Sequence, residues 1–334
     1  MKIVAEIGAS HNGSLERAVD TIAAAAVAGA DAIKLQTWSP DKMDCGGRVL
    51  DSGPWKGHSL RDLYRKAHTP WEWHQPIIDA ATKFGLEWWS TPFDYASVAF
   101  LESLHCPRYK IASFELIDTE LIKRVAQTGK PVILSTGMAT SKEIADAVFC
   151  ARVGNRIVDL TLLKCVSAYP ADPDTFNLMT MVDMGRAWGG VTDGVEVGIS
   201  DHTQTDAVPV AAAVLGASMI ERHLTIDREG GLDDSFASTP DQFKSMVGSV
   251  RTALAALGSV QYGAMQSELP SVALRRSLWI VEDIPAGETL NYSNLQTRRP
   301  ADGLEPQHLA SLLGKRVNRN LSAGTPMKWE YLKP

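Results

Sequence analysis

The amino-acid sequence predicts an α/β protein, a TIM (β/α)8 barrel followed by a small C-terminal domain. Eight short apolar runs recur over roughly 240 residues, the size of such a barrel, and amphipathic stretches separate them. The runs lack the polar–apolar alternation of a half-exposed sheet, so they fit parallel strands that are covered on both faces. A doubly wound open sheet is the alternative. The eight repeats, and the lack of a GxGxxG pattern after the first run, make it the weaker one.

The elements follow in order along the chain. The predicted strands are KIVAEIG, AIKLQT, LEWWSTPF, YKIAS, PVILSTG, LTLLKCVSAYP, VEVGIS and MIERHLT. Helices are expected between them, for example in LERAVDTIAAAAVAGA, ELIKRVAQTGK and SKEIADAVFCARVG, several of which close on a glycine or on Lys-Pro. The connection from Trp38 to Leu86 is longer than a barrel loop needs and is rich in aromatic residues. It is either a lid on the catalytic face or a structural excursion on the barrel rim.

The pattern changes after Leu257, which predicts a barrel over residues 1–256, a linker over 257–275 and a small domain over 276–334. The last segment contains an internal echo, DIPAGETLNYSNL and NLSAGTPMKWEYL, with an Ala-Gly turn in each copy. Such a repeat is typical of a small, partly β domain with pseudo-symmetry. At about 58 residues this domain is marginal for independent stability, so we expect it to dock on a partner surface.

Composition restricts the function class. The net charge of −6 argues against nucleic acid or an anionic membrane as partner. The start of the chain has no apolar run of signal-peptide length, and no later stretch approaches a membrane span, so a cytoplasmic protein is expected. The four cysteines, Cys45, Cys106, Cys150 and Cys165, have no CxxC spacing and are expected to be reduced and mostly buried.

Two histidines stand out because each follows a predicted strand. His202 ends the seventh strand region and His223 ends the eighth, so both imidazoles should emerge at the same carboxyl edge of the barrel. A single histidine would more often be a hydrogen-bonded core residue, but two at adjacent strand ends favour a divalent metal site. Two imidazoles completed by water suit Mn²⁺, or less tightly Mg²⁺. Zinc is less suited, because no third nitrogen or sulfur ligand is evident.

Other polar residues at the strand ends allow more than one interpretation. Lys34, Lys110, Ser113 and Ser135 fit a phosphate site, with ammonium charge and hydroxyl donors. The structural alternative is a salt bridge, Lys34 with Glu6 or Lys110 with Glu115. A lysine inside a barrel strand also allows a Schiff-base aldolase. Glu6 and Glu115 are candidates for proton transfer or for gripping sugar hydroxyls, and Asp233 could do either.

The chain closely resembles the sialic acid synthase family, which condenses phosphoenolpyruvate with an N-acetylated amino sugar. The motifs that carry the resemblance occur in the family's order: AEIGASHNGS, DAIKLQT, STPFD, YKIASFE, KPVILSTGM, CVSAYP, GISDHT and IERHLT. In the tail, RRSLWIVEDIPAGE and RRPADGL resemble the family's antifreeze-like (SAF) domain. The resemblance implies a TIM barrel with a SAF domain, in a domain-swapped homodimer where the SAF domain covers the partner's active site.

The resemblance also implies roles for individual residues. The metal ligands would be His202 and His223, with Mn²⁺ preferred and Mg²⁺ or Co²⁺ as alternatives. Phosphoenolpyruvate would be held by Lys34, Thr91, Lys110, Ser113, Ser135 and Ser200. The catalytic residues would be Glu6, Glu115 and the two histidines. The sugar would contact Gln36, Ser167, Tyr169, Asp233 and Arg299, the last reaching across the dimer toward the N-acyl group.

Two features separate this chain from the neuraminate branch of the family. Phe114 stands where that branch has glycine, and the loop after the eighth strand reads GGLDDSF instead of carrying Pro-Gly-Pro-Asp. Both features, with HTPWEW, resemble the branch that makes pseudaminic acid from a 2,4-diacetamido-2,4,6-trideoxy-hexose of the altrose type. Ala237 departs from that branch, which usually has serine there. Of the adjacent pair, Asp233 is preferred over Asp234 for the family role.

Three alternatives remain open. A neuraminate or legionaminate synthase would run the same chemistry on another sugar. A Schiff-base aldolase would use Lys110 or Lys34. A non-enzymatic carbohydrate-binding protein would rest on the SAF-like tail, although a binder would not need both histidines.

Overall fold

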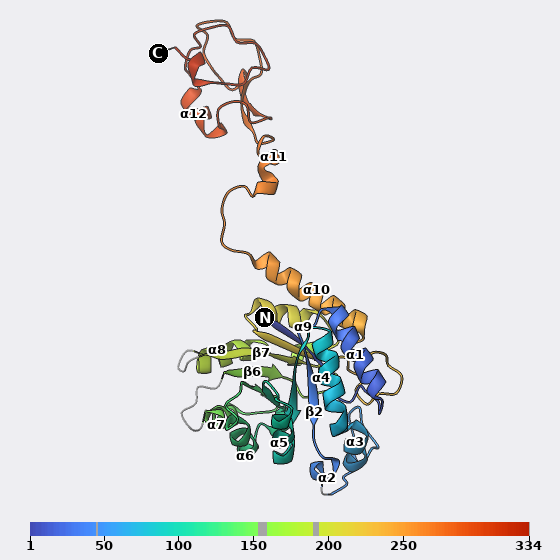
Figure 1. Cartoon of the computed structure of the whole chain (residues 1–334). Helices are drawn as coiled ribbons and strands as arrows, with labels where there is room; N and C mark the ends of the chain where they lie inside the picture. The colour runs from blue at the N-terminus through green and yellow to red at the C-terminus, as the bar shows by residue number, and fades with distance from the viewer. Residues whose placement is uncertain (45, 153–158, 190–193, 334) are drawn as a thin grey trace. The chain divides into compact units, whose positions relative to one another are not determined.

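The computed structural model describes residues 1–44, 46–152, 159–189 and 194–333. The chain forms two compact units, residues 1–258 and 259–334. The first unit contains a closed barrel of eight parallel strands (Figure 1). These are β1 (Lys2–Glu6), β2 (Ala32–Thr37), β3 (Glu87–Pro92), β4 (Tyr109–Ile111), β5 (Val132–Ser135), β6 (Leu160–Cys165), β7 (Val195–Asp201) and β8 (Met219–His223). The predicted fold class is confirmed, and each strand lies in one of the eight apolar runs, except that β7 extends one residue beyond its run to Asp201.

Each strand pairs with the next along the chain, and β8 pairs with β1 to close the barrel. The register sets neighbours at the carboxyl edge. Glu6 lies opposite Lys34 of β2 on one side and His223 of β8 on the other, and Ser200 of β7 lies opposite Glu221 of β8. Polar residues far apart in sequence are therefore adjacent in space.

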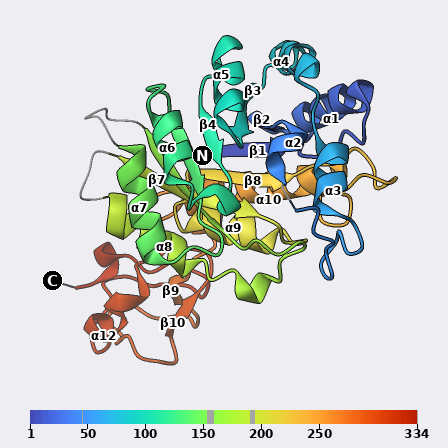
Figure 2. The same cartoon turned by 90° about the horizontal axis from the view of Figure 1, so that it is seen from below.

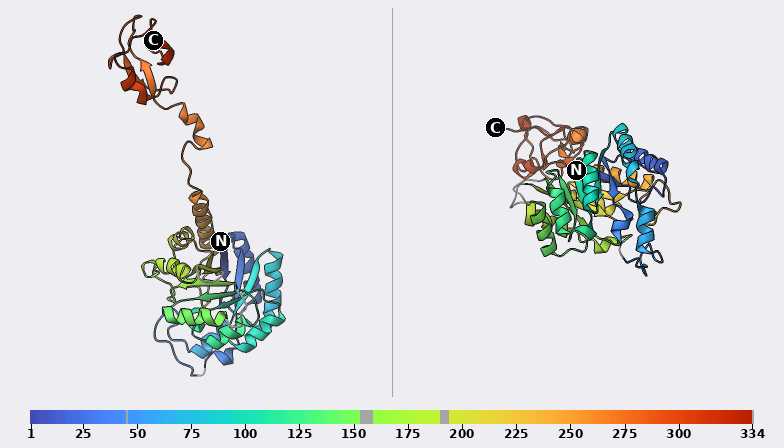
Figure 3. Two further views of the ribbon diagram at one scale, coloured as in Figure 1. Left: turned by 90° about the vertical axis from the view of Figure 1, so that its left-hand side faces the viewer. Right: turned by 60° about the horizontal axis from the view of Figure 1, so that its bottom comes forward.

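Helices form a ring outside the strands, as three further views also show (Figures 2 and 3). They are α1 (Leu15–Ala28), α4 (His74–Lys83), α5 (Tyr95–Ser103), α6 (Thr119–Ala126), α7 (Ser141–Ala151), α8 (Met179–Gly189), α9 (Ala207–Val214) and α10 (Pro240–Leu257). Local signals set their ends. Ser14 Oγ accepts the Arg17 N–H at 3.2 Å at the start of α1, and Gly29 ends that helix with a φ of 89°. Capping boxes begin α7 and α10.

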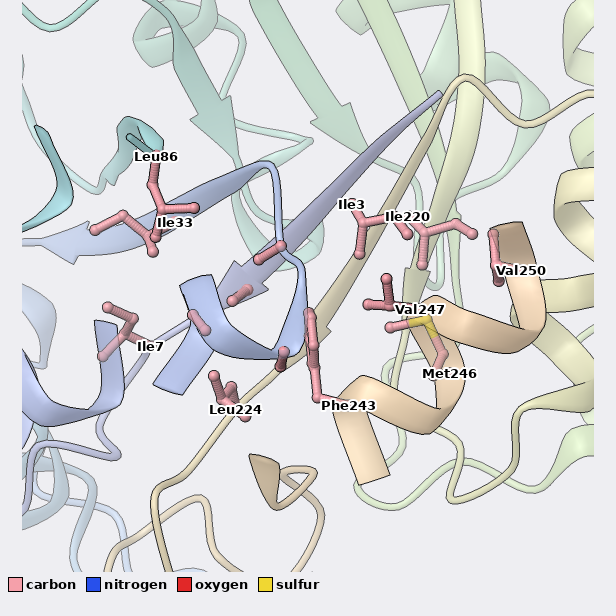
Figure 4. Close-up of a cluster of buried hydrophobic side chains, with 14 of the residues drawn as sticks. Ile3, Ile7, Ile33, Leu86, Ile220, Leu224, Phe243, Met246, Val247 and Val250 are labelled. Atoms are coloured by element: carbon pink, nitrogen blue, oxygen red, sulfur yellow. The ribbon is translucent and has the colours of Figure 1, made fainter. Parts of the chain in front are cut away.

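The helix α10 packs against the two strands that close the barrel (Figure 4). Ile3 of β1 and Ile220 of β8 belong to the same buried cluster as Phe243, Met246 and Val247 of this helix. Burying side chains of this size is worth roughly 1.5–3 kcal/mol each. This apolar layer holds β1 and β8 in register, and the carboxyl ends of these two strands carry Glu6 and His223.

The long connection after β2 is only partly an insertion. Its last segment is α4, which packs against α1 and β3 as the second helix of the barrel ring. Neither interpretation, a lid or a rim excursion, therefore applies to the whole of residues 38–86, because the repeat resumes at His74. The extra part contains α2 (Pro40–Met43), α3 (Leu60–Ala67) and the 3-10 turn η1 (Trp71–Trp73).

Short 3-10 turns follow two further strands, η2 (Ser113–Glu115) and η3 (Pro173–Thr175). The second unit contains η4 (Gln266–Glu268), α11 (Leu269–Val272), β9 (Ser277–Ile280), β10 (Leu295–Arg298), η5 (Pro306–His308), α12 (Leu309–Leu312) and η6 (Trp329–Tyr331). The strands β9 and β10 are antiparallel, and the unit has its own apolar cluster that includes Leu278, Ile280 and Leu312.

The internal echo in the second unit corresponds to a pair of equivalent turns. Ile284 and Leu321 exchange backbone hydrogen bonds of 2.8 and 2.9 Å. Asp283 Oδ1 accepts the Ala323 N–H at 2.7 Å, and the residue equivalent to Asp283, Asn320, accepts the Ala286 N–H at the same distance. The two copies of the repeat therefore cap each other. This reciprocal arrangement explains why both retain Asp or Asn before the Ala-Gly turn.

Cys106, Cys150 and Cys165 are buried free thiols, as expected, whereas the prediction for Cys45 lies outside the described residues. Within the parts of the chain that the structure describes, no helix is both long and apolar enough to cross a membrane.

Candidate active site

Four charged side chains meet inside the carboxyl end of the barrel. Lys34 Nζ contacts the Glu6 carboxylate and lies 3.8 Å from Glu221 Oε1. Lys110 Nζ lies 3.3 Å from the same Glu221 oxygen, which also accepts the Ser200 hydroxyl at 3.2 Å. The salt bridge considered for Lys34 with Glu6 is present. The one considered for Lys110 with Glu115 is wrong, because the ammonium group points to Glu221 across the barrel.

Burial and pairing oppose each other in this cluster. At Lys34 burial would lower the pKa, but the carboxylates of Glu221 and Glu6 outweigh it and the pKa is raised. At Lys110 burial prevails and the pKa is lowered, since Glu221 compensates only in part and the charge of Lys34 adds to the lowering. Burial alone would raise the pKa of Glu221, but the two ammonium groups lower it to about 2. An added anion would stabilise the ammonium form of Lys110.

Two more predicted residues form hydrogen bonds with the charged groups of this cluster. Thr91 Oγ1 accepts a hydrogen bond from Lys34 Nζ at 3.2 Å, and Gln36 Nε2 donates to Glu6 Oε1 at 3.0 Å. Glu6 is therefore engaged through both oxygens, by Lys34 on one side and Gln36 on the other. This fixes its carboxylate at the boundary between the lysines and His223.

Hydroxyl groups converge beside the lysines from three successive loops. The Gly137 N–H donates to Ser113 Oγ at 3.1 Å. A Cβ at Gly137 would lie 2.2 Å from Ser167 Oγ and 2.7 Å from Ser113 Oγ, so only glycine fits here. Ser135 Oγ is buried and lacks a hydrogen-bond partner among the described residues. An unsatisfied hydroxyl beside the lysine cluster is suited to an oxygen of a phosphate group.

The two predicted metal ligands lie side by side above this cluster. The ring centroids of His202 and His223 are 5.4 Å apart. His202 Nδ1 lies 2.9 Å from the Val166 carbonyl oxygen, and His223 Nδ1 lies 3.3 Å from Asp233 Oδ2. Metal-binding histidines commonly donate one ring N–H to a carbonyl or carboxylate, which leaves the other nitrogen for the ion. The pair therefore fits a metal through Nε2 of each ring.

A third protein ligand is not evident. Across residues 1–44, 46–152, 159–189 and 194–333, no group of three His, Cys, Asp or Glu side chains is placed to hold a metal ion. Two imidazoles with the other positions open to water or substrate would suit Mn²⁺ better than a structural zinc site.

The structure separates the roles of the adjacent aspartates. Asp233 Oδ2 accepts the Ala9 N–H at 3.0 Å and faces His223. Gly8 lies so close that a Cβ there would be 2.3 Å from the same oxygen. Asp234 instead turns back into its own loop, where its carboxylate accepts the Gly231 N–H at 2.6 Å and the Thr225 hydroxyl at 2.9 Å. These contacts support Asp233 as the residue that faces the substrate.

We expect Asp233→Asn and Asp234→Asn to have different consequences. Asp233→Asn should weaken metal affinity by about 10–100-fold, because it removes the carboxylate that orients His223. Asp234→Asn should lower the unfolding midpoint while leaving metal affinity within about threefold, because it loosens the loop and leaves the Asp233 contacts in place. Equilibrium dialysis with Mn²⁺ and thermal unfolding measure the two effects. Equal loss of metal affinity in both variants would contradict the assignment.

Glu115 lies just past the lysine cluster, at the end of η2. Burial raises its pKa to about 7, although the charge of Lys110 lowers it in part. Its Oε2 atom is buried without a hydrogen-bond partner among the described residues. A carboxyl group that titrates near neutral pH can give or take a proton at the site.

The raised pKa of Glu115 predicts a specific pH dependence of stability. Between pH 4.5, the ordinary pKa of a glutamate, and about pH 7, the native state keeps a proton on Glu115 that the unfolded state has lost. Its contribution to stability is therefore present below pH 4.5 and is lost as the pH rises through 7. Glutamine mimics the protonated form. The free energy of unfolding of Glu115→Gln should therefore rise by roughly 1–3 kcal/mol relative to that of wild type between pH 5 and pH 8. Urea unfolding at both pH values measures the difference. A gain that does not change with pH would contradict the prediction.

Aromatic rings enclose the histidines on the outer side. Tyr169 lies 4.2 Å from His202 between ring centroids, and Phe236 lies 5.0 Å from His223. Tyr169 and Phe236 also contact each other, at 4.9 Å. Burial raises the pKa of the Tyr169 phenol, so the hydroxyl stays protonated and available as a donor.

Most of the predicted residues therefore lie at one end of the barrel. Those in contact with one another or with the same partners are Glu6, Lys34, Gln36, Thr91, Lys110, Ser113, Ser167, Tyr169, Ser200, His202, His223 and Asp233. Ser135 and Glu115 border the same region. Arg299 follows β10 in the second unit, so its reach toward a partner's active site stays a prediction.

Sequence reasoning missed the roles of several residues in the site. Glu221 is the centre of the charged cluster, yet it received no function. The signal was present, because a glutamate inside an apolar strand needs a buried partner. Asp201 and Arg222, which also lie at the ends of β7 and β8, form an ion pair with each other, and Arg222 also pairs with Asp206. Gly137 and Phe236 lie inside motifs that the sequence analysis used, KPVILSTGM and GGLDDSF, but neither residue was given a role of its own.

Comparison with known proteins adds to this geometry. The model of the NeuB family matches residues 21–262, and that of the SAF domain matches residues 275–333. A pseudaminic acid synthase of Helicobacter pylori is 40% identical over 333 residues, which cover 98% of this chain and 96% of that protein. An N,N'-diacetyllegionaminic acid synthase of Legionella pneumophila is 33% identical, with 99% and 94% covered. The crystal structure of the spore coat polysaccharide biosynthesis protein SpsE of Bacillus subtilis superposes with a TM-score of 0.66 at 31% identity, covering 100% of this chain and 95% of that one.

Proposed function

Because the chain belongs to the NeuB family, we propose that it condenses phosphoenolpyruvate with an N-acetylated amino sugar to give a nine-carbon nonulosonic acid and phosphate. The preferred sugar is 2,4-diacetamido-2,4,6-trideoxy-altrose, which makes the enzyme a pseudaminic acid synthase in type. The observation that carries the proposal is the buried Lys34–Glu221–Lys110 cluster with the unsatisfied hydroxyl of Ser135 beside it and two oriented histidines above it.

The reaction balances as follows. Carbon 3 of phosphoenolpyruvate forms a bond to the aldehyde carbon of the open-chain sugar, and the aldehyde oxygen takes a proton to become a hydroxyl. Water adds to carbon 2 of the former phosphoenolpyruvate and releases that proton. The tetrahedral intermediate then breaks its carbon–oxygen bond to phosphate, and the carbon-2 hydroxyl gives its proton to the departing phosphate, which leaves the keto acid. A divalent ion, when bound, would supply Lewis acidity at the aldehyde.

The residues of this chain supply binding, orientation and proton control. Lys34 and Lys110 hold the phosphate and carboxylate charges, and Ser113 and Ser135 donate hydroxyls to the phosphate oxygens. Ser200 and Thr91 complete the same subsite. Holding both reactants in register makes carbon–carbon bond formation effectively unimolecular.

The sugar subsite lies between the histidines and the rim. Glu6 and Glu115 flank the reacting end, where Glu115 exchanges a proton near neutral pH. Gln36, Ser167, Tyr169 and Asp233 supply hydrogen bonds to the sugar. The higher identity to a pseudaminic acid synthase than to a legionaminic acid synthase supports the altrose sugar.

The test is phosphate release from phosphoenolpyruvate with Mn²⁺, with and without a chelator. The altrose sugar, 2,4-diacetamido-2,4,6-trideoxy-mannose and N-acetylmannosamine are supplied separately. Turnover of the altrose sugar alone, abolished by chelator and restored by Mn²⁺, is expected. Preference for another sugar would overturn the sugar assignment and leave the chemistry standing. Phosphate release from none of the three would overturn the proposal.

A Schiff-base aldolase is the second candidate, and the lowered pKa of Lys110 is the observation that favours it. That mechanism predicts a covalent adduct at Lys110 when borohydride is added with substrate, and it predicts no effect of chelators. The synthase predicts no adduct. Mass spectrometry of the intact protein after borohydride treatment separates the two.

We also propose a domain-swapped homodimer as the working form. Exposed apolar side chains rim the barrel mouth at Phe114, Ile117 and Met138, and burying them under a second subunit's SAF domain would stabilise it. Mixing inactive His202→Gln and Arg299→Ala subunits tests the swap, because one site of the mixed dimer is then intact. Recovered activity supports the swap, and none contradicts it.

A further inference from the structure

A small hairpin in the connection after β2 carries a single half-buried aromatic side chain. Val49 and Ser59 form an antiparallel bridge at its base. The Leu50 N–H donates to the His58 carbonyl at 3.0 Å, and the Gly57 N–H donates to the Leu50 carbonyl at 2.8 Å. Of the residues 51–57 at its tip, all except Trp55 are exposed. Trp55 is therefore the one anchored side chain at the tip of the hairpin.

Trp55 contacts the rings that enclose the histidines. Its ring centroid lies 5.5 Å from Tyr169 and 5.8 Å from Phe236. Its indole N–H donates to the Leu232 carbonyl at 2.9 Å. These three partners belong to the loops after β6 and β8, and none belongs to the hairpin itself.

The topology makes these contacts informative. In a closed barrel of eight strands in sequence order, β2 and β6 are separated by four positions and lie on opposite sides. A side chain that starts from the loop after β2 and touches Tyr169 after β6 must lie over the mouth of the barrel. Trp55 therefore closes the site from above.

Trp55 also separates two spaces. On the outer side it lines a cavity of about 790 Å³ whose walls include His58, Arg65 and Lys66. Among the described residues that line this cavity, none is a predicted catalytic or substrate-binding residue. The indole stands between this cavity, which it lines, and the rings of Tyr169 and Phe236, which it contacts.

We infer that Trp55 forms the apolar end wall of the sugar subsite and selects a sugar whose terminal carbon is a methyl group. The inference rests on the proposed function. Tyr169 contacts both His202 and Trp55. A six-carbon sugar with its aldehyde carbon at the histidines would therefore extend past Tyr169, and its terminal carbon would reach the indole.

The chemistry of the wall decides the preference. The only polar side-chain atom of Trp55 already donates a hydrogen bond to the Leu232 carbonyl, and the neighbouring Phe236 has no polar side-chain atom. A terminal hydroxymethyl group would therefore lose its water without gaining a partner here, whereas a methyl group would not. An apolar pocket discriminates against an added hydroxyl by up to about a hundredfold.

The test compares two sugars that differ only at carbon 6, 2,4-diacetamido-2,4,6-trideoxy-altrose and 2,4-diacetamido-2,4-dideoxy-altrose. Wild type should prefer the 6-deoxy sugar by roughly 10–100-fold in kcat/KM. Trp55→Ala should reduce this preference to about threefold or less and raise KM for the sugar, with KM for phosphoenolpyruvate within about twofold of wild type. Trp55→Phe, which keeps an apolar wall, should retain most of the preference.

Lys56→Ala is the matched control, because Lys56 is exposed on the same hairpin. This variant should leave the sugar preference and the KM values for both substrates unchanged. If Trp55→Ala fails to fold, Trp55→Phe and Trp55→Gln carry the comparison, and only the glutamine variant should lose the preference. A preference that persists in both Trp55→Ala and Trp55→Gln, or a wild type with no preference at carbon 6, would overturn the inference while the proposed function stands. A wild type that releases no phosphate with either sugar, or with the other sugars proposed above, would overturn both.

Discussion

Replacing Glu221 with glutamine is expected to destabilise the protein by about 3–5 kcal/mol, because it leaves a buried ammonium group without its counter-charge. Lys34 keeps Glu6 as a partner in this variant. Lys110 has no other carboxylate within 4 Å among the described residues, since Glu221 Oε1 is its only ion-pair contact. The loss therefore comes mainly from Lys110. Urea unfolding at pH 7 measures it.

The same interaction predicts a pH dependence with a defined sign. The pKa of Glu221 is lowered to about 2 from an ordinary value of 4.5. The stabilisation is thus present above pH 4.5 and is lost as the pH falls toward 2. Wild type and Glu221→Gln should therefore converge in stability as the pH is lowered from 6 toward 3.

Two further variants make the prediction sharp. Lys110→Met combined with Glu221→Gln removes both charges and should recover much of the lost stability, although activity stays low. Glu120→Gln alters an exposed ion pair with Lys123 and should have no measurable effect. If the double variant were less stable than Glu221→Gln alone, an isolated Lys110 charge would not be the cause.

The sequence was sufficient for the fold because its signal is repeated. Eight apolar runs of similar length allow few architectures, and the strand ends then place polar residues at one edge. Lys34 and His223 could be predicted to share a site with Glu6 for that reason alone. Adjacent strands bring all three together, whatever the loops between them do.

Details that depend on side-chain direction could not be predicted in this way. Whether Asp233 or Asp234 faces His223 depends on the hydrogen bonds of a loop, and spacing does not encode them. The pairing of Lys110 across the barrel with Glu221 depends on the barrel's width. The position of Trp55 over the site could not be predicted for the same reason, since its partners lie in loops more than a hundred residues away.

The largest effect on catalysis is expected from the two histidines. His202→Gln and His223→Gln should each lower kcat by about a thousandfold, since Lewis acidity at the aldehyde is worth several kcal/mol. Each should also abolish Mn²⁺ binding in equilibrium dialysis, which reports on the site independently of turnover. The unfolding midpoint should change little without metal, because neither ring takes part in the buried ion pairs of the lysine cluster.

A surface histidine provides the control for these variants. His105 is exposed and has a φ of 56°, a conformation that asparagine tolerates, so His105→Asn should keep wild-type turnover and metal binding.

Altering the hydrogen-bond partners of the two imidazoles, instead of the imidazoles themselves, should give a graded loss of metal affinity. His202 is oriented by the Val166 backbone carbonyl, which substitution cannot remove, whereas His223 depends on the Asp233 side chain. Asp233→Asn should therefore retain more metal affinity than His223→Gln but less than wild type. Normal Mn²⁺ binding in both histidine variants would mean that the ion, if required, binds elsewhere, and that the imidazoles act on the substrate directly.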